Sequence, residues 1–194
     1  MALQRDNPRR ALLDASLALI EAEGLEAFSM REVARRAGLS HQAPYHYFTD
    51  REAILAAIVA EGFQGLRDAS LAALEGHSDP AKRFSAIGQA YLDFALAHPA
   101  HFKLMFRSEL VREDKHHEAR ACAEGAYEVL VRTAAEVAEK SGQDQRVVML
   151  LAWSAVHGLA TLMLEGKLDK AIPARPDREK AAAAAITLLE TLWR

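Results

Sequence analysis

Apolar residues recur every three to four positions through most of this chain, whereas strand signals do not recur. Near the N-terminus, Leu13, Leu17 and Ile20 form one apolar stripe with the spacing of an amphipathic helix. Asn7 followed by Pro8 is typical of a helix start, because asparagine caps free N–H groups and proline suits the first helical position. The pattern predicts a helix from Pro8 to about Gly24 and favours an all-α fold.

A second, short helix is predicted after Ser29. Ser29 and Glu32 have the spacing of a capping box, in which each side chain bonds the backbone N–H of the other. Gly38 ends this helix, because glycine readily takes the left-handed backbone of a sharp turn. Ala34 is small enough for the next helix to pack closely across this one.

Two further helix starts follow the glycine turn. Ser40 can cap a third short helix over residues 41–47, in which Pro44 should tighten the first turn because it cannot donate to the Ser40 carbonyl. Thr49 and Glu52 have the spacing of another capping box, which begins a longer fourth helix. Two short helices joined by a tight glycine turn predict a helix-turn-helix, whose second helix can enter the major groove of DNA.

The segment from residue 40 to 49 contains no acidic side chain that DNA phosphates would repel. Gln42 can pair with adenine, and the tyrosine hydroxyls can reach phosphates. The rings could instead form the core of a small helical domain. We assign Phe48 to that core and Tyr45 to the surface. The side chains able to hydrogen-bond bases or phosphates are Ser40, His41, Gln42, Tyr45, His46 and Tyr47.

The run "ALLDASLALIEAEGLEAFSMREVARRAGLSHQAPYHYFTDREAILAAI", residues 11–58, resembles the DNA-binding domain of TetR-family transcriptional regulators. The agreement covers the first helix, the "AGLS" turn, the "YHYF" end of the third helix and the start of the fourth. Arg51 stands where the family usually has lysine, and Ala43-Pro44 departs from the family pattern, which bears on base preference. The resemblance implies that DNA is faced by Ser29, Arg31, Ser40, His41, Gln42, Ala43, Tyr45, His46, Tyr47 and Arg51.

Helix signals continue to the end of the chain. Asp79-Pro80 begins a helix, His98-Pro99 ends it and begins another, and Gly142 closes a long amphipathic helix. The following 18 residues, 147–164, carry no formal charge and would be long enough to cross a membrane. Ser154, His157 and Thr161 interrupt that stretch, so we expect no membrane span but a helix buried by its own domain and by a second subunit.

The resemblance implies that the last two helices, about 145–166 and 177–194, form a homodimer interface. Dimerisation would place two recognition helices about one DNA turn apart and favour a palindromic operator.

Trp153 and His157 share a helix face, and with Gly158 they resemble the Trp-His-Gly (WHG) subclass of TetR C-terminal domains. One interpretation is that His157 lines a pocket for an unknown, apolar or aromatic effector. The other is a core histidine that bonds a neighbouring helix, with Gly158 there for close packing. The effector-binding candidates are Tyr91, Phe94, Phe102, Met105, Phe106, Trp153 and His157.

Composition narrows the functional classes. The chain has 194 residues, a net charge of −3 and one cysteine, Cys122. Any affinity for nucleic acid must therefore be local, and no disulfide within the chain is possible. No secretory signal is evident at the N-terminus, so we expect a cytoplasmic, nucleoid-associated protein. Glycine-rich phosphate loops, nucleophile elbows and zinc motifs do not occur, so we expect no catalytic residue, metal or cofactor.

The sequence thus predicts an all-α protein with a three-helix DNA-binding domain at residues 1–50 and a larger helical effector-binding and dimerisation domain at residues 51–194. The predicted function is a homodimeric transcriptional regulator, more specifically a repressor that an effector releases from double-stranded operator DNA. Two alternatives stay open at this point. One is an effector-independent DNA-binding dimer, and the other is a helical enzyme or metal-binding protein with His101, His116, His117 and His157 as candidate ligands.

Overall fold

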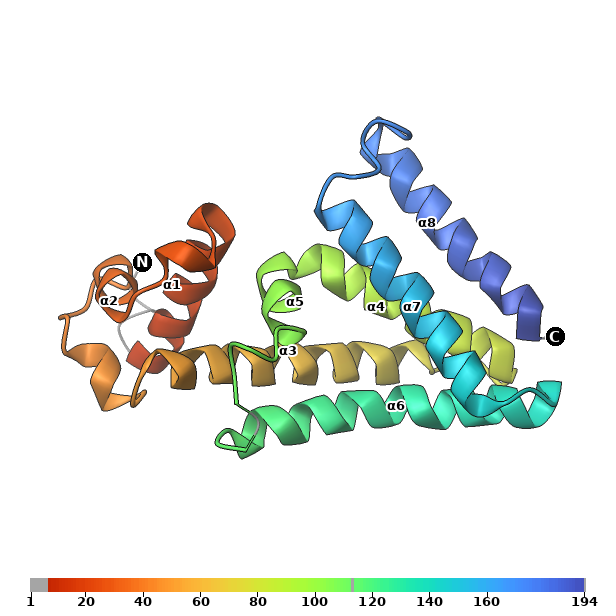
Figure 1. Cartoon of the computed structure of the whole chain (residues 1–194), viewed down its shortest axis with the longest axis horizontal. Helices are drawn as coiled ribbons and strands as arrows, with labels where there is room; N and C mark the ends of the chain where they lie inside the picture. The colour runs from red at the N-terminus through yellow and green to blue at the C-terminus, as the bar shows by residue number, and fades with distance from the viewer. Residues whose placement is uncertain (1–6, 113, 194) are drawn as a thin grey trace. The chain divides into compact units, whose positions relative to one another are not determined.

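The computed structural model describes residues 7–112 and 114–193, and in this part of the chain every regular element is helical, as predicted (Figure 1). The chain divides into two compact units. Unit 1 comprises the described residues up to Phe63 together with Pro99–Cys122, and unit 2 comprises Gln64–His98 and the described residues from Ala123 onward. The elements are α1 (Pro8–Glu23), η1 (Leu25–Ala27), α2 (Met30–Arg36), η2 (Ala43–His46), α3 (Arg51–Ala73), α4 (Pro80–Ala97), α5 (Pro99–Met105), α6 (His117–Ser141), α7 (Gln145–Leu164), α8 (Arg175–Glu190) and η3 (Thr191–Trp193).

Unit 1 is built around the apolar stripe of α1. The Asn7 side chain accepts a hydrogen bond from the Arg10 N–H at 3.0 Å, so the predicted cap of α1 is confirmed. Leu12, Leu13 and Leu19 of α1 are fully buried against α2 and the beginning of α3. Each such side chain contributes roughly 1.5–3 kcal/mol through its removal from water.

The turn after α2 is the glycine turn that the sequence predicts. Gly38 has a φ of +69°, and the Leu39 and Gly38 N–H groups donate to the carbonyls of Ala34 and Arg35 at 2.9 and 3.2 Å. These are the two bonds of a Schellman motif. Ala34 is fully buried, in agreement with its predicted role at the close approach of the next element.

The segment after this turn is not the predicted α-helix over residues 41–47 but a turn followed by the four-residue 3₁₀ helix η2. The Ala43 N–H donates to Ser40 O at 3.0 Å, and Tyr45 donates to Gln42 O at 3.1 Å. Because Pro44 has no N–H, the bond that would continue an α-helix from Ser40 is missing, and bonding three residues apart takes over. Pro44 therefore tightens the whole segment rather than its first turn alone.

Two predicted capping boxes are only partly correct. Ser29 does accept the Glu32 N–H, at 3.2 Å, but the Glu32 carboxylate accepts hydrogen bonds from arginines of α2 instead of from Ser29. At the start of α3 the capping side chain is Asp50, which accepts the Ala53 N–H at 2.8 Å, rather than Thr49. The carboxylates of Glu32 and Glu52 could accept either a backbone N–H of the cap or an arginine guanidinium. Both accept from arginines, because hydrogen bonds between charged groups are stronger.

In unit 2, α4 packs against both α7 and α8. Asp79 caps α4 by accepting the Lys82 N–H at 3.2 Å, and Gly142 ends α6 with a φ of +71°, both as predicted. Phe84 and Trp193 pack edge to face with ring centroids 6.2 Å apart, next to the buried Val148. The end of the chain is therefore anchored on α4.

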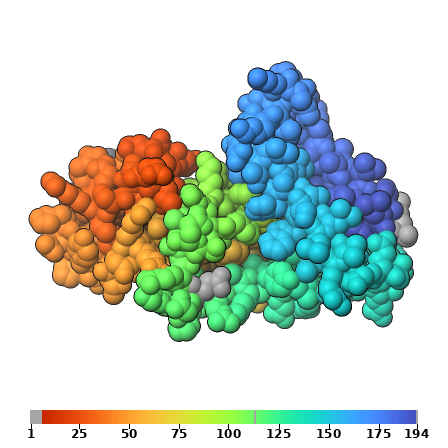
Figure 2. All heavy atoms as spheres, in the orientation of Figure 1, coloured from red at the N-terminus to blue at the C-terminus, as the bar shows by residue number. Residues whose placement is uncertain are grey.

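The described residues leave one face of α7 uncovered. By length and composition α7 is the one helix in the described part that could span a membrane, yet only 17% of its apolar window is buried. The described residues of one chain therefore bury only part of α7, and the expected cover by a second subunit stays a prediction. In Figure 2 the cyan and blue spheres of α7 and α8 lie at the surface. The large apolar side chains left exposed on α7 are Val147, Leu150, Leu151 and Leu162.

We expect Gly38→Ala to lower the free energy of unfolding by about 1–2 kcal/mol, because a Cβ atom strains the left-handed backbone. A Cβ at this position would meet no atom within 4 Å, so the loss would come from backbone strain alone. Gly38→Asn should cost less, since asparagine tolerates this conformation better. Urea unfolding of the three proteins measures the effect, and equal losses for Ala and Asn would contradict the explanation.

Candidate nucleic-acid interface

Burial divides the segment after the glycine turn into an inner and an outer side. Pro44 and Phe48 are buried, so the assignment of Phe48 to the core is confirmed. Tyr45 and Tyr47 are 56% and 44% exposed. Of the residues predicted to face DNA, Ala43 is half-buried, and those exposed are Ser29, Arg31, Ser40, His41, Gln42, Tyr45, His46, Tyr47 and Arg51.

Arg51 is held in place at the first turn of α3. Its guanidinium donates to the Leu25 carbonyl at 3.2 Å and lies over the Phe28 ring, 5.5 Å from the ring centroid. One bond to a carbonyl uses only one of the five guanidinium N–H donors. The remaining guanidinium N–H groups of Arg51 can donate to an anion, and the contacts with Leu25 and Phe28 already fix the position of this side chain.

The acidic residue of α2 is neutralised by its neighbours. The Glu32 carboxylate accepts hydrogen bonds from Arg35 at 2.6 Å and from Arg36 at 2.9 Å, and these bonds lower the pKa of Glu32 to about 2. Arg36 also pairs with Glu23 of α1. Negative charge on α2 is therefore balanced locally, which limits its repulsion of a polyanion.

A contact that the sequence did not indicate holds the start of α3. The Glu52 carboxylate accepts the Arg112 backbone N–H at 2.9 Å and its guanidinium at 2.8 Å, and His116 Nε2 lies 3.3 Å from the same carboxylate. The hydrogen bonds from Arg112 lower the pKa of Glu52 to about 2. The contact ties the residue after Arg51 to the segment that follows α5, within unit 1.

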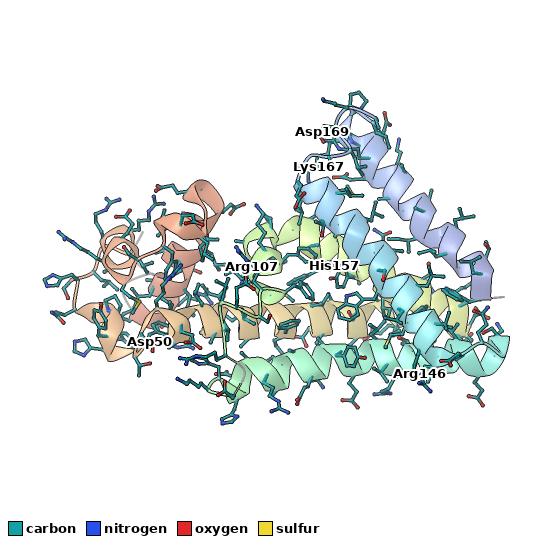
Figure 3. The ribbon with its side chains drawn as sticks, in the orientation of Figure 1. Asp50, Arg107, Arg146, His157, Lys167 and Asp169 are labelled. Atoms are coloured by element: carbon teal, nitrogen blue, oxygen red, sulfur yellow. The ribbon has the colours of Figure 1, made fainter. Side chains whose placement is uncertain are left out.

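In unit 2, the side chains of Trp153 and His157 both form a hydrogen bond with Tyr91. The Tyr91 hydroxyl of α4 lies 2.7 Å from His157 Nδ1, and the Trp153 side chain also hydrogen-bonds Tyr91. Burial raises the pKa of Tyr91 and lowers the pKa of His157, so both groups are neutral near pH 7. The indole N–H can only donate, so the Tyr91 hydroxyl accepts from Trp153, while the direction of its bond to Nδ1 follows the tautomer of His157. Figure 3 shows His157 on α7.

The predicted effector contacts fall into both units. Phe102, Met105 and Phe106 lie in unit 1, where the Phe102 and Phe106 rings pack with centroids 5.3 Å apart. Tyr91, Phe94, Trp153 and His157 lie in unit 2. The bond from His157 to α4 suits a core histidine as well as a ligand contact, so its role in effector binding stays a prediction. Gly158 is not closely packed against another element, because a Cβ there would meet no described atom outside its own stretch of helix within 4 Å.

The described part of the chain gives little support to a metal site. No group of three or more His, Cys, Asp or Glu side chains there is placed to hold a metal ion. A groove of about 320 Å³ lies between α4 and α8 and contains none of the predicted effector contacts. Its lining residues are Gln89, Leu92, Asp93, Leu96, Ala97, Arg175 and Glu179.

Comparisons with known proteins agree with this architecture. A family described as bacterial regulatory proteins, tetR family, matches residues 12–58, and one described as tetracyclin repressor-like, C-terminal domain, matches residues 84–189. The HTH-type transcriptional regulator BetI of Rhizobium meliloti is 39% identical over 79 residues, which make up 41% of this chain and 39% of that regulator. The chain thus spans well under half the length of this curated relative.

Solved structures are similar over nearly the whole chain. A protein of unknown function from Rhodococcus sp. RHA1 is 32% identical, with a TM-score of 0.75 over 95% of this chain and 94% of its own. The TetR-family transcriptional regulator PfmR from Thermus thermophilus shares the fold at 24% identity, with a TM-score of 0.70 over 93% and 97% of the two chains.

We expect Glu52→Gln to destabilise the protein at neutral pH, and the difference from wild type should shrink as the pH falls from about 4.5 to about 2. A carboxylate whose pKa is lowered by folding stabilises the native state above its unfolded pKa and loses that effect as it becomes protonated. Urea unfolding at a series of pH values measures this difference. Glu26→Gln, which removes an exposed carboxylate, should leave stability at neutral pH unchanged. A difference that stays constant down to pH 2 would show that the ion pair is not responsible.

Proposed function

Because the chain belongs to the TetR family of bacterial regulatory proteins, we propose that it is a DNA-binding transcriptional regulator, a homodimeric repressor that a small-molecule effector releases from a palindromic operator. The observation that carries this proposal is the exposed, acid-free face of residues 40–47 on a helix-turn-helix. The named relatives are regulators rather than enzymes, so we propose no catalytic role. The protein would act in the cytoplasm, associated with the nucleoid.

We propose that residues 1–50 form the DNA-binding part and residues 51–194 the effector-binding and dimerisation part. Within the first part, Gln42 would read bases, because its amide can donate and accept towards adenine. Arg51 and the hydroxyls of Tyr45 and Tyr47 would contact phosphates and so fix the orientation of the protein on the duplex. Tyr45 lies in the 3₁₀ helix η2, and Gln42 and Tyr47 flank it directly.

The proposed dimer uses the uncovered faces of α7 and α8. Leu150 and Leu188 are 59% and 69% exposed, which is unusual for large apolar side chains unless a partner covers them. The Gln143 side chain donates to the Leu192 carbonyl at 2.8 Å, so the beginning of α7 and the end of the chain lie at the same end of unit 2.

The size of the exposed side chains changes along this surface. Exposed leucines lie at the end where α7 begins and the chain finishes, whereas Ser154 on α7 and Ala181, Ala184 and Ala185 on α8 are exposed further from that end; Leu162 is exposed at the other end of α7. An antiparallel, two-fold pairing would place the large side chains of one copy against the small ones of the other. Such a surface is self-complementary, as a closed dimer requires.

We propose that the effector binds in the C-terminal part. The candidate contacts in unit 2 are Tyr91, Phe94, Trp153 and His157, and those in unit 1 are Phe102, Met105 and Phe106. Aromatic rings, a thioether and one neutral Tyr–His pair suit an apolar or aromatic molecule with a single hydrogen-bonding group. The effector would release DNA by favouring the conformation that does not fit the operator. An operator complex that no metabolite dissociates would instead support an effector-independent DNA-binding dimer.

Selection of bound duplexes from a random pool, at near-physiological salt, should enrich a palindrome. We expect Gln42→Ala to change the base enriched at one position of each half-site, by about 1–3 kcal/mol of discrimination. Arg51→Ala and Tyr45→Phe should weaken binding to all sequences without changing the preferred one. Tyr127→Phe, at a tyrosine of unit 2 that is 44% exposed, is the matched control and should bind as wild type. If Gln42→Ala kept the wild-type preference, the assignment of base readout would be wrong.

We expect Leu150→Asp and Leu188→Asp each to convert the dimer to monomers, because a buried carboxylate without a partner is strongly unfavourable. Sedimentation velocity over a range of concentrations measures the change. Leu71→Asp alters a leucine of α3 that is 40% exposed and should leave the dimer intact. A dimer that survives both α7 and α8 changes would place the interface elsewhere.

A further inference from the structure

We propose that Arg9, which lies outside the set of residues predicted to face DNA, contacts a phosphate of the duplex next to the segment at residues 40–47. The inference rests on the proposed function and adds a contact from α1 to it. Arg9 is an exposed residue in the first turn of α1, and α1 packs against η2. A guanidinium at this position can give a phosphate two parallel hydrogen bonds.

The side chain of Arg9 is held beside the DNA-facing segment by an aromatic ring. Its guanidinium carbon lies 5.4 Å from the centroid of the Phe48 ring. Phe48 is itself fixed, because it is buried in the core of unit 1 and its N–H donates to the Pro44 carbonyl at 2.9 Å. The cation therefore lies beside the ring that anchors the segment at residues 40–47.

The charge of Arg9 is not used within the described part of the protein. No carboxylate or carbonyl there accepts a hydrogen bond from it, and α1 has no acidic residue in its first turn. Its neighbour Arg10 differs in this respect, since it forms ion pairs with Asp14 and Glu61, both at 2.8 Å. Of these two adjacent arginines, Arg10 is neutralised by ion pairs within the protein, whereas Arg9 is able to bind an anion.

Folding stability does not explain a cation at this position. A positive charge near the N-terminus of a helix is disfavoured by the helix dipole. The contact with the Phe48 ring is favourable by a similar amount, so the two effects roughly cancel. Arg9 places a positive charge at the N-terminus of a helix without a gain in stability, so a role in binding explains it more readily.

The test measures how the affinity for the selected operator duplex depends on salt, by fluorescence anisotropy between about 50 and 200 mM salt. Each phosphate contact contributes about 0.9 to the slope of log K against log salt, so Arg9→Ala should reduce the slope by about 1.8 for a dimer. Arg9→Lys should keep most of the slope, because it keeps the charge. Arg10→Ala is the matched control and should leave the slope unchanged, since its guanidinium is already paired.

Thermal melts of all variants confirm that each is folded at the temperature of the measurement. An Arg9→Ala slope equal to that of wild type, with the operator still bound, would overturn the phosphate contact and leave the proposed function standing. Equal reductions for Arg9→Ala and Arg10→Ala would also overturn it, because the effect would then not depend on an unpaired cation. If wild type selects no sequence and binds no duplex, the proposed function fails and the contact fails with it.

Discussion

The proposed DNA-facing surface depends on the burial of Pro44 and Phe48 against the core of unit 1. These two side chains anchor a segment that has only a short 3₁₀ helix of its own, and a helix of four residues has little stability in isolation. Once they are buried, the side chains between and before them must face outward. Removing an apolar anchor would therefore disorder the polar residues without touching any of them.

Electrostatics around this anchor are arranged locally rather than across the whole protein. The chain has a net charge of −3, which would repel a polyanion if the charge were evenly spread. Instead Glu32 is neutralised by Arg35 and Arg36, and Glu52 by Arg112. The same clusters of ion pairs connect α2 to α1 and the start of α3 to the segment after α5. Charge compensation and mechanical support are thus supplied by the same side chains.

Unit 2 presents a different physical problem. Its core is closed by α4, α6, α7 and the end of the chain, yet large apolar side chains of α7 and α8 remain in contact with water. Within the described part of the chain nothing covers them, and a soluble protein rarely leaves a continuous apolar surface exposed without a use. The proposed cover for these side chains is a second copy of the chain.

Sequence patterns were sufficient for several interactions between residues close in the chain, such as the cap formed by Asn7 and the turn at Gly38, but not for the cap of α3, which Asp50 forms rather than Thr49. The type of the η2 helix was harder, because Pro44 indicates a tighter turn but not how far the tightening extends. Only the tertiary structure decided the contact between Glu52 and Arg112, which are 60 positions apart. For the same reason the sequence could identify α7 as apolar but could not show which of its faces the chain itself buries. Local bonding is determined by neighbours in the sequence, whereas burial and ion pairing are determined by neighbours in space.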